Sequence, residues 1–292
     1  MSEVLAGIRA FWHRAWEPEW AGGWEGVRWL WLLAALLTHA PRVRYIPDSY
    51  AAQDMVFTRG FMAVADYVVI DAPAGYALWT LGMMGLLMVA LGGRWTKPGA
   101  LVFLAGAYTL ASHEALNTKA YDRLLVWETM ALLLSPLGER NLTKKWRSPF
   151  GRWVMLIVFM AIYGSTGWLK MLDEPHWFDG TALAYHLVDL HFGHTALGAW
   201  LSQHLWITLA MGISTIAFEA FFPILVLVRR TNPWVLVAGF GFHLGIMALM
   251  HVGTFSFVAV AGYPVLLRPD IARSWYRRAH AWLAGKRSSA AI

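Results

Sequence analysis

The chain has 292 residues, of which 58% are hydrophobic, and carries a formal net charge of +6 at pH 7. Soluble domains are about 45–50% apolar, so this composition predicts a polytopic membrane protein with little length left for a soluble domain. The chain has no cysteine, which excludes disulfide frameworks, thiol catalysis and thiolate metal sites.

The N-terminal stretch mixes charged and apolar side chains and contains no long apolar core. This pattern is typical of a helix that lies on a membrane surface, and not of a cleaved secretory signal. We therefore expect residues 1–25 to form an amphipathic helix on the cytoplasmic side. A second amphipathic stretch, residues 51–70, is also expected to lie along the membrane.

A series of apolar stretches follows, each long enough to cross or nearly cross a bilayer. They predict an all-α, polytopic membrane helix bundle of about eight transmembrane helices, with a range of six to eight, over residues 26–268. The expected spans are 26–40, 73–93, 99–119, 121–137, 150–172, 205–228, 233–251 and 254–268. Residues 269–292 are expected to form a basic cytoplasmic tail.

The distribution of basic residues gives the expected orientation. Most of the 24 Lys and Arg residues fall in segments that share one side if both termini are cytoplasmic. The positive-inside rule therefore favours a cytoplasmic N-terminus, a cytoplasmic C-terminus and, if the protein is bacterial, the inner membrane. The positive charge is thus explained by topology, and no nucleic-acid partner is expected.

Lys170 closes the fifth predicted span. Gly164 and Gly167 thin the helix just before it, and Trp177 follows shortly after the helix is expected to end. The ammonium group could extend to the interface as an anchor. It could instead turn inward, where loss of water makes a lysine a usable base.

His243 lies within the longest uncharged run, residues 233–267. As one helix this run would extend about 52 Å, well beyond a hydrocarbon core of roughly 30 Å, so we expect two spans that fold back at residues 251–254. Gly241 and Gly245 are expected to allow close packing on a neighbouring helix. The histidine could be a hydrogen-bonded clasp between helices or a neutral acid–base group.

Other polar residues leave their roles open. Glu114, Glu128 and Glu219 lie inside predicted spans, where they are expected to avoid lipid, and they suit structural and catalytic roles equally. His191 and His194 have a spacing compatible with one helical face, but no HExxH pattern accompanies them. No metal site is predicted.

Three segments resemble one membrane-protein family in the expected order. LKMLDEPHWFDGTALAYHL, residues 169–187, resembles a signature of the vitamin K-dependent gamma-glutamyl carboxylase and its HTTM (horizontally transferred transmembrane) relatives. The segment of residues 242–267 is similar to that family's phenylalanine–histidine segment, and residues 117–125 are similar to its asparagine-led entry to a span. The resemblance covers roughly residues 20–270.

The resemblance implies a pocket for a reduced quinone similar to vitamin K hydroquinone, and no metal. By position, Lys170 matches the region that supplies the base and His243 matches the span histidine. Asn117 matches the asparagine at the pocket rim, and Trp177 and Phe255 are the further expected cofactor-binding residues. The implied chemistry is oxygen-linked epoxidation or carboxylation, of a carbon–carbon lyase or monooxygenase type, at the exoplasmic face.

Two functional interpretations remain. The first is a short HTTM-type enzyme that acts on a membrane lipid or quinone. The second is a non-catalytic scaffold or maturation partner that binds a peptide or another membrane protein, with Lys170 as an anchor and His243 as a clasp. A transporter is less favoured, because the sequence shows no broken-helix repeats.

Overall fold

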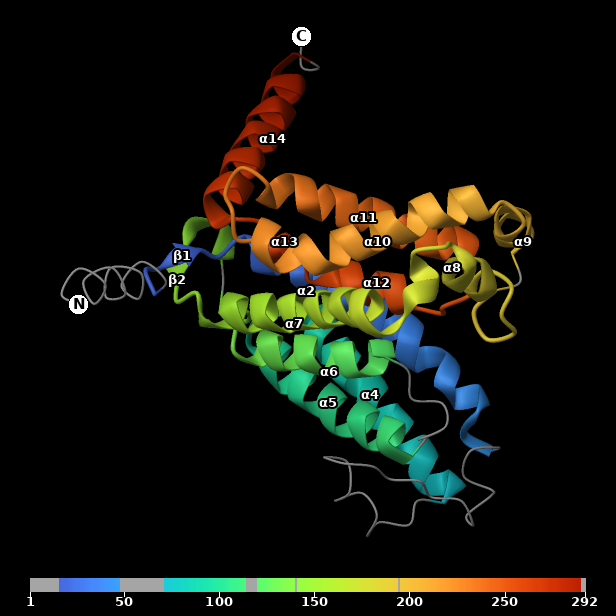
Figure 1. Cartoon of the computed structure of the whole chain (residues 1–292). Coiled ribbons are helices and arrows are strands. Elements are labelled where there is room, and N and C mark those ends of the chain that lie inside the picture. Colours follow the sequence, from blue (N-terminus) through green and yellow to red (C-terminus); the bar gives the residue numbers. More distant parts are fainter. Residues whose placement is uncertain (1–15, 48–70, 114–119, 140, 194, 290–292) are drawn as a thin grey trace, which may run out of the picture.

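The structure is a computed structural model that describes residues 16–47, 71–113, 120–139, 141–193 and 195–289 (Figure 1). Most of this part is helical, and its one sheet pairs β1 (Glu19–Trp20) antiparallel with β2 (Trp146–Arg147). The long helices are α2 (Gly23–His39), α4 (Ala72–Leu91), α5 (Thr96–His113), α6 (Ala120–Leu133), α7 (Phe150–Asp173), α10 (Leu205–Leu225), α11 (Asn232–Leu249) and α14 (Pro269–Ser289). The short helices are η1 (Ala40–Arg44), η3 (Gly93–Trp95), η4 (Leu142–Lys144), η5 (Pro175–Trp177), α8 (Thr181–His186), α9 (Ala196–Ser202), α12 (Phe255–Ala261) and α13 (Tyr263–Leu266).

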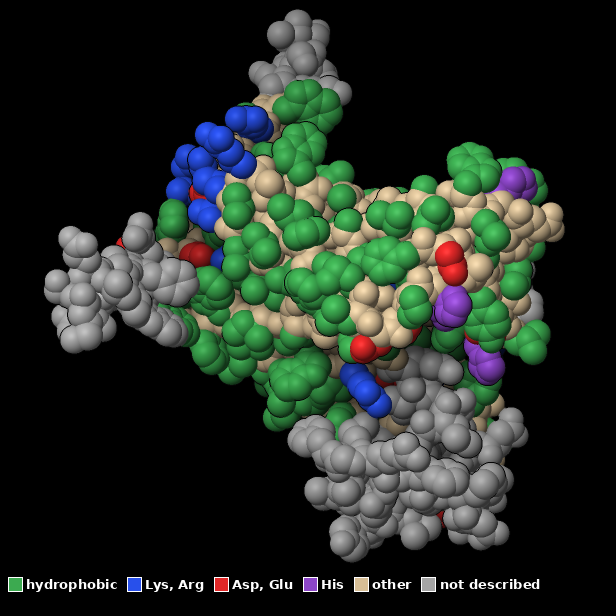
Figure 2. All heavy atoms as spheres, viewed as in Figure 1, with side chains coloured by type: hydrophobic (Ala, Val, Ile, Leu, Met, Phe, Trp, Pro, Cys, Tyr) green, Lys and Arg blue, Asp and Glu red, His purple; other side chains and the backbone are tan. Residues whose placement is uncertain are grey.

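The helices form a bundle around a central core. The α7 helix packs along α10, α4 packs along α5, and α2 contacts α12 in the middle (Figure 1). The three largest fully buried side chains in the core are aromatic: Trp31, Phe159 and Phe222. Large apolar side chains also cover the outer faces of the helices, as expected for a bundle whose solvent is lipid (Figure 2).

Four helices, α4, α7, α10 and α11, are long and apolar enough to cross a membrane. A fifth span is obtained if α12–α13 and the sharply bent α14 are counted as one. The prediction of an integral membrane helix bundle is therefore confirmed. The count of eight stays a prediction, because α2 has 17 residues and α6 has 14, which is short for a core of roughly 30 Å.

The predicted reversal after α11 is confirmed. The α11 helix ends at Leu249 and α12 begins at Phe255, and Gly253 between them has a φ of +61°. Only glycine adopts this backbone conformation without strain, so the glycine permits the chain to turn back. The uncharged run thus forms separate helices, as its length required.

The two predicted amphipathic segments, residues 1–25 and 51–70, are not confirmed as surface helices. Residues 51–70 and residues 1–15 lie outside the described part of the chain. The remainder of the predicted 1–25 helix is not continuous, because it contains β1, and α2 begins only at Gly23. Trp20 explains the difference: its indole N–H donates to the Thr143 carbonyl at 2.8 Å, which holds this stretch beside β2.

One ion-pair cluster joins the connection between α6 and α7 to β2. Glu139 accepts hydrogen bonds from Arg147 at 2.5–3.0 Å and from Lys145 at 2.7 Å. These contacts, those from Arg147 first, lower the pKa of Glu139 from 4.5 to about 2. The cluster is partly exposed, so its contribution to stability is small.

A pH dependence follows from this cluster. Since the folded-state pKa is depressed, the stabilisation is complete above about pH 4.5 and is lost as the pH falls through about 2. We expect the midpoint of thermal unfolding in detergent to fall between pH 5 and pH 2.5, and Glu139→Gln to reduce that fall. Glu25→Gln, which removes a carboxylate with a single arginine partner, is the control. An unchanged acid response in Glu139→Gln would contradict the assignment.

Candidate functional site

Lys170, near the C-terminal end of α7, is held by a carboxylate from α10. Its Nζ donates to Oε2 of Glu219 at 2.5 Å. The Lys170 side chain is 20% exposed and that of Glu219 is 8% exposed. The ammonium therefore points into the α7–α10 interface and does not extend freely outward.

Two glycines bring these helices together. A Cβ at Gly167 would lie 2.4 Å from the backbone nitrogen of Ala220, and one at Gly164 would lie 3.0 Å from the ring of Pro223. Any larger residue at Gly167 would therefore push α10 away. The predicted thinning of α7 before Lys170 is confirmed, and its consequence is that Glu219 comes within reach.

Trp177 covers the same ion pair. Lys170 Nζ lies 5.0 Å from the centre of a Trp177 ring, which is within cation–π range. The Trp177 indole N–H donates to Glu174 at 2.5 Å, and the side chain is buried against Ile216 and Leu183. Trp177 therefore packs within a small core at the α8–α10 corner and does not lie exposed at the surface.

His243 lies in α11, 1% exposed, and belongs to a hydrogen-bonded chain of three side chains. Its Nε2 is 2.6 Å from the Tyr163 hydroxyl, which is 2.8 Å from the Tyr263 hydroxyl. Rings of Phe242 and Phe255 lie 5.3 and 5.5 Å from the imidazole, so its surroundings are apolar. His243 and Phe255, both expected to bind the cofactor, therefore lie side by side.

The hydrogen bonds between His243, Tyr163 and Tyr263 can be arranged in two ways. In one, Nε2–H of His243 donates to Tyr163, which donates to Tyr263. In the other, Tyr263 donates to Tyr163, which donates to Nε2, so that Nδ1 carries the ring hydrogen. Nδ1 is buried and has no hydrogen-bond partner in the described part of the chain. The hydrogen bonds between the three side chains can therefore point in either direction along the series.

Tyr163 and Tyr263 were missed by the sequence reasoning. Tyr163 precedes Lys170 by two helical turns, so both side chains lie on one face of α7, with Thr166 between them. That spacing was visible in the sequence. Tyr263 offered a weaker signal, because it lies in the four-residue helix α13 and no sequence spacing relates it to Tyr163.

Two acids lie near this array. Glu219 lies in α10 and Glu128 in α6, and both helices pack against α7. Glu128 is completely buried, and its oxygens make no side-chain hydrogen bond within the described residues. A buried carboxyl without a cation beside it is stable only in its protonated form. Glu128 is therefore a neutral acid at the edge of the array, whereas Glu219 is part of an ion pair.

The predicted site residues thus form two groups that α7 connects. Lys170, Glu219 and Trp177 form the first, and His243 and Phe255 belong to the second, around Tyr163. Lys170 and His243 make no direct contact. Asn117 and Glu114 lie outside the described residues, as does His194.

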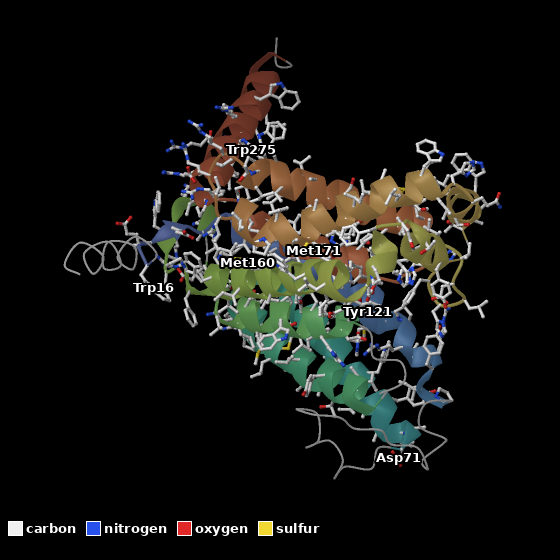
Figure 3. All side chains as sticks on the ribbon, viewed as in Figure 1. Trp16, Asp71, Tyr121, Met160, Met171 and Trp275 are labelled. Atoms are coloured by element: carbon white, nitrogen blue, oxygen red, sulfur yellow. The ribbon has the colours of Figure 1, made fainter. Side chains whose placement is uncertain are left out.

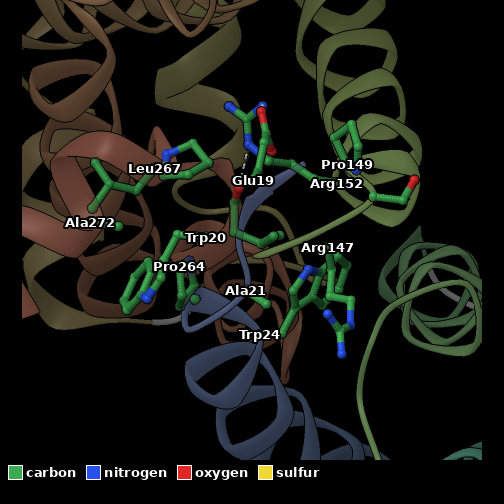
Figure 4. Close-up of a pocket in the computed structure, with 14 residues that line it drawn as sticks. Glu19, Trp20, Ala21, Trp24, Arg147, Pro149, Arg152, Pro264, Leu267 and Ala272 are labelled. Carbon is green, nitrogen blue, oxygen red and sulfur yellow. Dashed lines mark hydrogen bonds and ion pairs between the residues drawn. The ribbon is translucent and has the colours of Figure 1, made fainter. Parts of the chain in front are cut away.

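Two pockets lie elsewhere. One, with an empty volume of about 340 Å³ partly open to solvent, is lined by Glu19, Trp20 and Arg152 at the β1–β2 end (Figure 4). Arg152 donates to Glu19 and to the Val265 carbonyl there, so its guanidinium links β1 and α13 to α7. The other, of about 330 Å³, lies between α2, α5 and α6 beside His39. Neither is lined by Lys170 or His243.

Within the described residues, no group of three or more His, Asp or Glu side chains could hold a metal ion. Comparison with known proteins does not assign the protein to a family. No family model matches the chain, and neither a curated protein nor a solved structure matches it. The functional argument therefore depends on the residues themselves.

Proposed function

We propose that the protein is an HTTM-type membrane enzyme that binds a reduced quinone or a similar lipid and performs oxygen-linked, epoxidase- or carboxylase-like chemistry. The proposal includes eight spans, cytoplasmic termini and a site toward the exoplasmic half of the bundle. One observation carries it: α7 presents Lys170 and the His243-bonded Tyr163 on a single face, both largely removed from water.

This face offers groups that suit a ring bearing hydroxyls. A quinol, when bound, supplies reducing equivalents and an acidic O–H. Lys170 retains 20% exposure, so it remains accessible beside Glu219. After passing its proton to Glu219, the neutral amine can accept a proton from a substrate hydroxyl. Tyr163 and His243 supply further hydrogen-bonding groups on the same face.

A non-catalytic scaffold is the second candidate, and one observation favours it. His243 is sealed among aromatic rings, and its hydrogen bond to Tyr163 ties α11 to α7. That is the arrangement expected of a structural clasp. In this case the partner is a peptide or another membrane protein, and no quinone binds the bundle.

Mass spectrometry of lipids extracted from the purified protein separates the candidates. We expect a quinone with the wild type and with Lys144→Ala, an exposed lysine remote from the site. Lys170→Ala should retain at least about tenfold less, because a hydrogen bond to a charged group contributes roughly 1.5–3 kcal/mol. His243→Ala should retain several-fold less, because a hydrogen bond between neutral groups contributes roughly 0.5–1.5 kcal/mol. Size-exclusion profiles establish that each variant is folded.

Two results would contradict the proposal. Absence of any quinone from the wild type would favour the scaffold. Equal amounts in all four proteins would show that Lys170 and His243 do not hold the ligand.

A further inference from the structure

The α14 helix leaves the bundle nearly at a right angle. Its axis is bent by 92° from the Phe255–Leu266 segment that precedes it (Figure 1). Since the long helices cross the membrane, a helix perpendicular to that segment runs along the membrane surface. The position of α14 beside β1 and β2 places it at one end of the bundle.

The sequence of α14 has two faces. At 100° per residue, Ile271, Trp275, Ala279 and Trp282 share one side. Arg273 and Arg277 lie on the other side, and Arg278 lies at the edge of the apolar side. The side chains of Trp275 and Trp282 are about half exposed or more and are not buried in the core of the bundle. Figure 2 shows the hydrophobic side chains on the side of α14 that overhangs the bundle and the basic ones on the opposite side, and Figure 3 labels Trp275.

Contacts with the bundle fix the orientation of α14. The Arg273 guanidinium lies 4.9 Å from the centre of the Trp146 ring, and the Tyr276 ring is 5.6 Å from that of Trp20. Asp270, the single acid in the sequence of α14, pairs with Arg229 at 2.8 Å and with Arg268 at 3.3 Å. These contacts fix the rotation of α14 about its axis. Its apolar face is turned toward the side on which the long helices lie (Figure 2).

The α14 helix does not complete a span. A span formed by α12–α13 and α14 together would carry Arg273, Arg277 and Arg278 into hydrocarbon, at roughly 2.5–3.5 kcal/mol for each arginine near the centre. Lying flat, the helix keeps these side chains in water or among headgroups. Its exposed indole rings then lie at the depth that tryptophan prefers.

We propose that α14 is a surface helix that binds an anionic bilayer, with Trp275, Ala279 and Trp282 in the headgroup–acyl boundary. Charge complementarity identifies the partner as anionic phospholipid, because Arg277 and Arg278 are exposed and no acid besides Asp270 lies on the helix. Each exposed arginine near such a surface contributes attraction that falls off within a Debye length. This inference is independent of the proposed quinone site.

The absence of cysteine makes the test direct. Ala279→Cys and Ala281→Cys place an environment-sensitive fluorophore on opposite faces of α14, 200° apart at 100° per residue. In nanodiscs containing phosphatidylglycerol, we expect the probe at 279 to emit at shorter wavelength and to be quenched by doxyl lipid. The probe at 281 should be quenched by aqueous iodide.

Charge dependence identifies the lipid. Arg277→Gln with Arg278→Gln should weaken doxyl quenching at 279 several-fold in nanodiscs containing phosphatidylglycerol, and replacing that lipid with phosphatidylcholine should do the same. Equal iodide access at 279 and 281 would overturn the proposal, as would quenching at 279 that is the same in both lipids.

Discussion

Replacing Lys170 with methionine should destabilise the bundle by about 3 kcal/mol, the lower end of the range for breaking a buried ion pair. The reason is less the lost attraction than the group left behind. Glu219 is 8% exposed in α10, and without the ammonium 2.5 Å away it must either bear an uncompensated charge or take up a proton. Denaturant unfolding in detergent, followed by tryptophan fluorescence, measures the effect.

A double variant separates the pair from its parts. Lys170→Met combined with Glu219→Leu should recover most of the lost stability, because both charged groups are then replaced by apolar ones. Arg229→Gln is the matched control: it breaks the exposed pair with Asp270 and should cost less than about 1 kcal/mol. Equal losses in Lys170→Met and Arg229→Gln would mean that the Lys170 pair is effectively solvated.

Stability and function can be separated at this position. Lys170→Arg keeps a positive charge beside Glu219, so it should preserve folding better than methionine does. Arginine does not lose its proton at ordinary pH, and therefore cannot serve as a base. A variant that folds and binds quinone but does not turn it over would assign the base to Lys170.

The sequence identified Lys170 and Glu219 separately but could not pair them. They lie 49 positions apart, on helices that meet because Gly167 allows the Ala220 backbone to approach. Both residues were recognised because charge is rare inside apolar spans. Their distance depends on helix packing, for which a single sequence carries little information.

The glycines around His243 show a second limit of prediction from the sequence. Gly241 and Gly245 were expected to pack closely on a neighbour, yet neither has a described atom within 4 Å of its Cβ position. Gly239 makes the close approach instead: a Cβ there would lie 2.4 Å from the Tyr263 hydroxyl. In a membrane protein both the lipid-facing and the packed sides are apolar, so hydrophobicity does not indicate which glycines lie in an interface.

The number of spans was harder to predict than their existence. The apolar runs of α4, α7, α10 and α11 are long, and hydropathy alone identifies them. The α12–α13 segment is short because it covers only Phe255–Leu266 before the chain bends by 92° into α14. Short helices of this kind are covered by their neighbours, so bilayer thickness does not set their length.

Gly85→Ala should have the second large effect, a loss of about 3 kcal/mol, at the upper end of the usual cost of overpacking. Gly85 lies where α4 crosses α5, and a Cβ there would be 2.3 Å from the backbone nitrogen of Phe103 and 2.7 Å from the carbonyl oxygen of Gly99. Both obstacles are backbone atoms, so no side chain can rotate away and the two helices must separate. Small residues at such crossings are what allow membrane helices to gain packing energy.

Gly245→Ala is the matched control for this prediction. Its Cβ would meet no described atom within 4 Å, and alanine is favoured over glycine in a helix by roughly 1 kcal/mol. We therefore expect the thermal midpoint in detergent to fall for Gly85→Ala and to stay level or rise for Gly245→Ala. If the two midpoints move together, the effect of each substitution comes from helix propensity, and α4 and α5 do not meet as closely as the Gly85 contact requires.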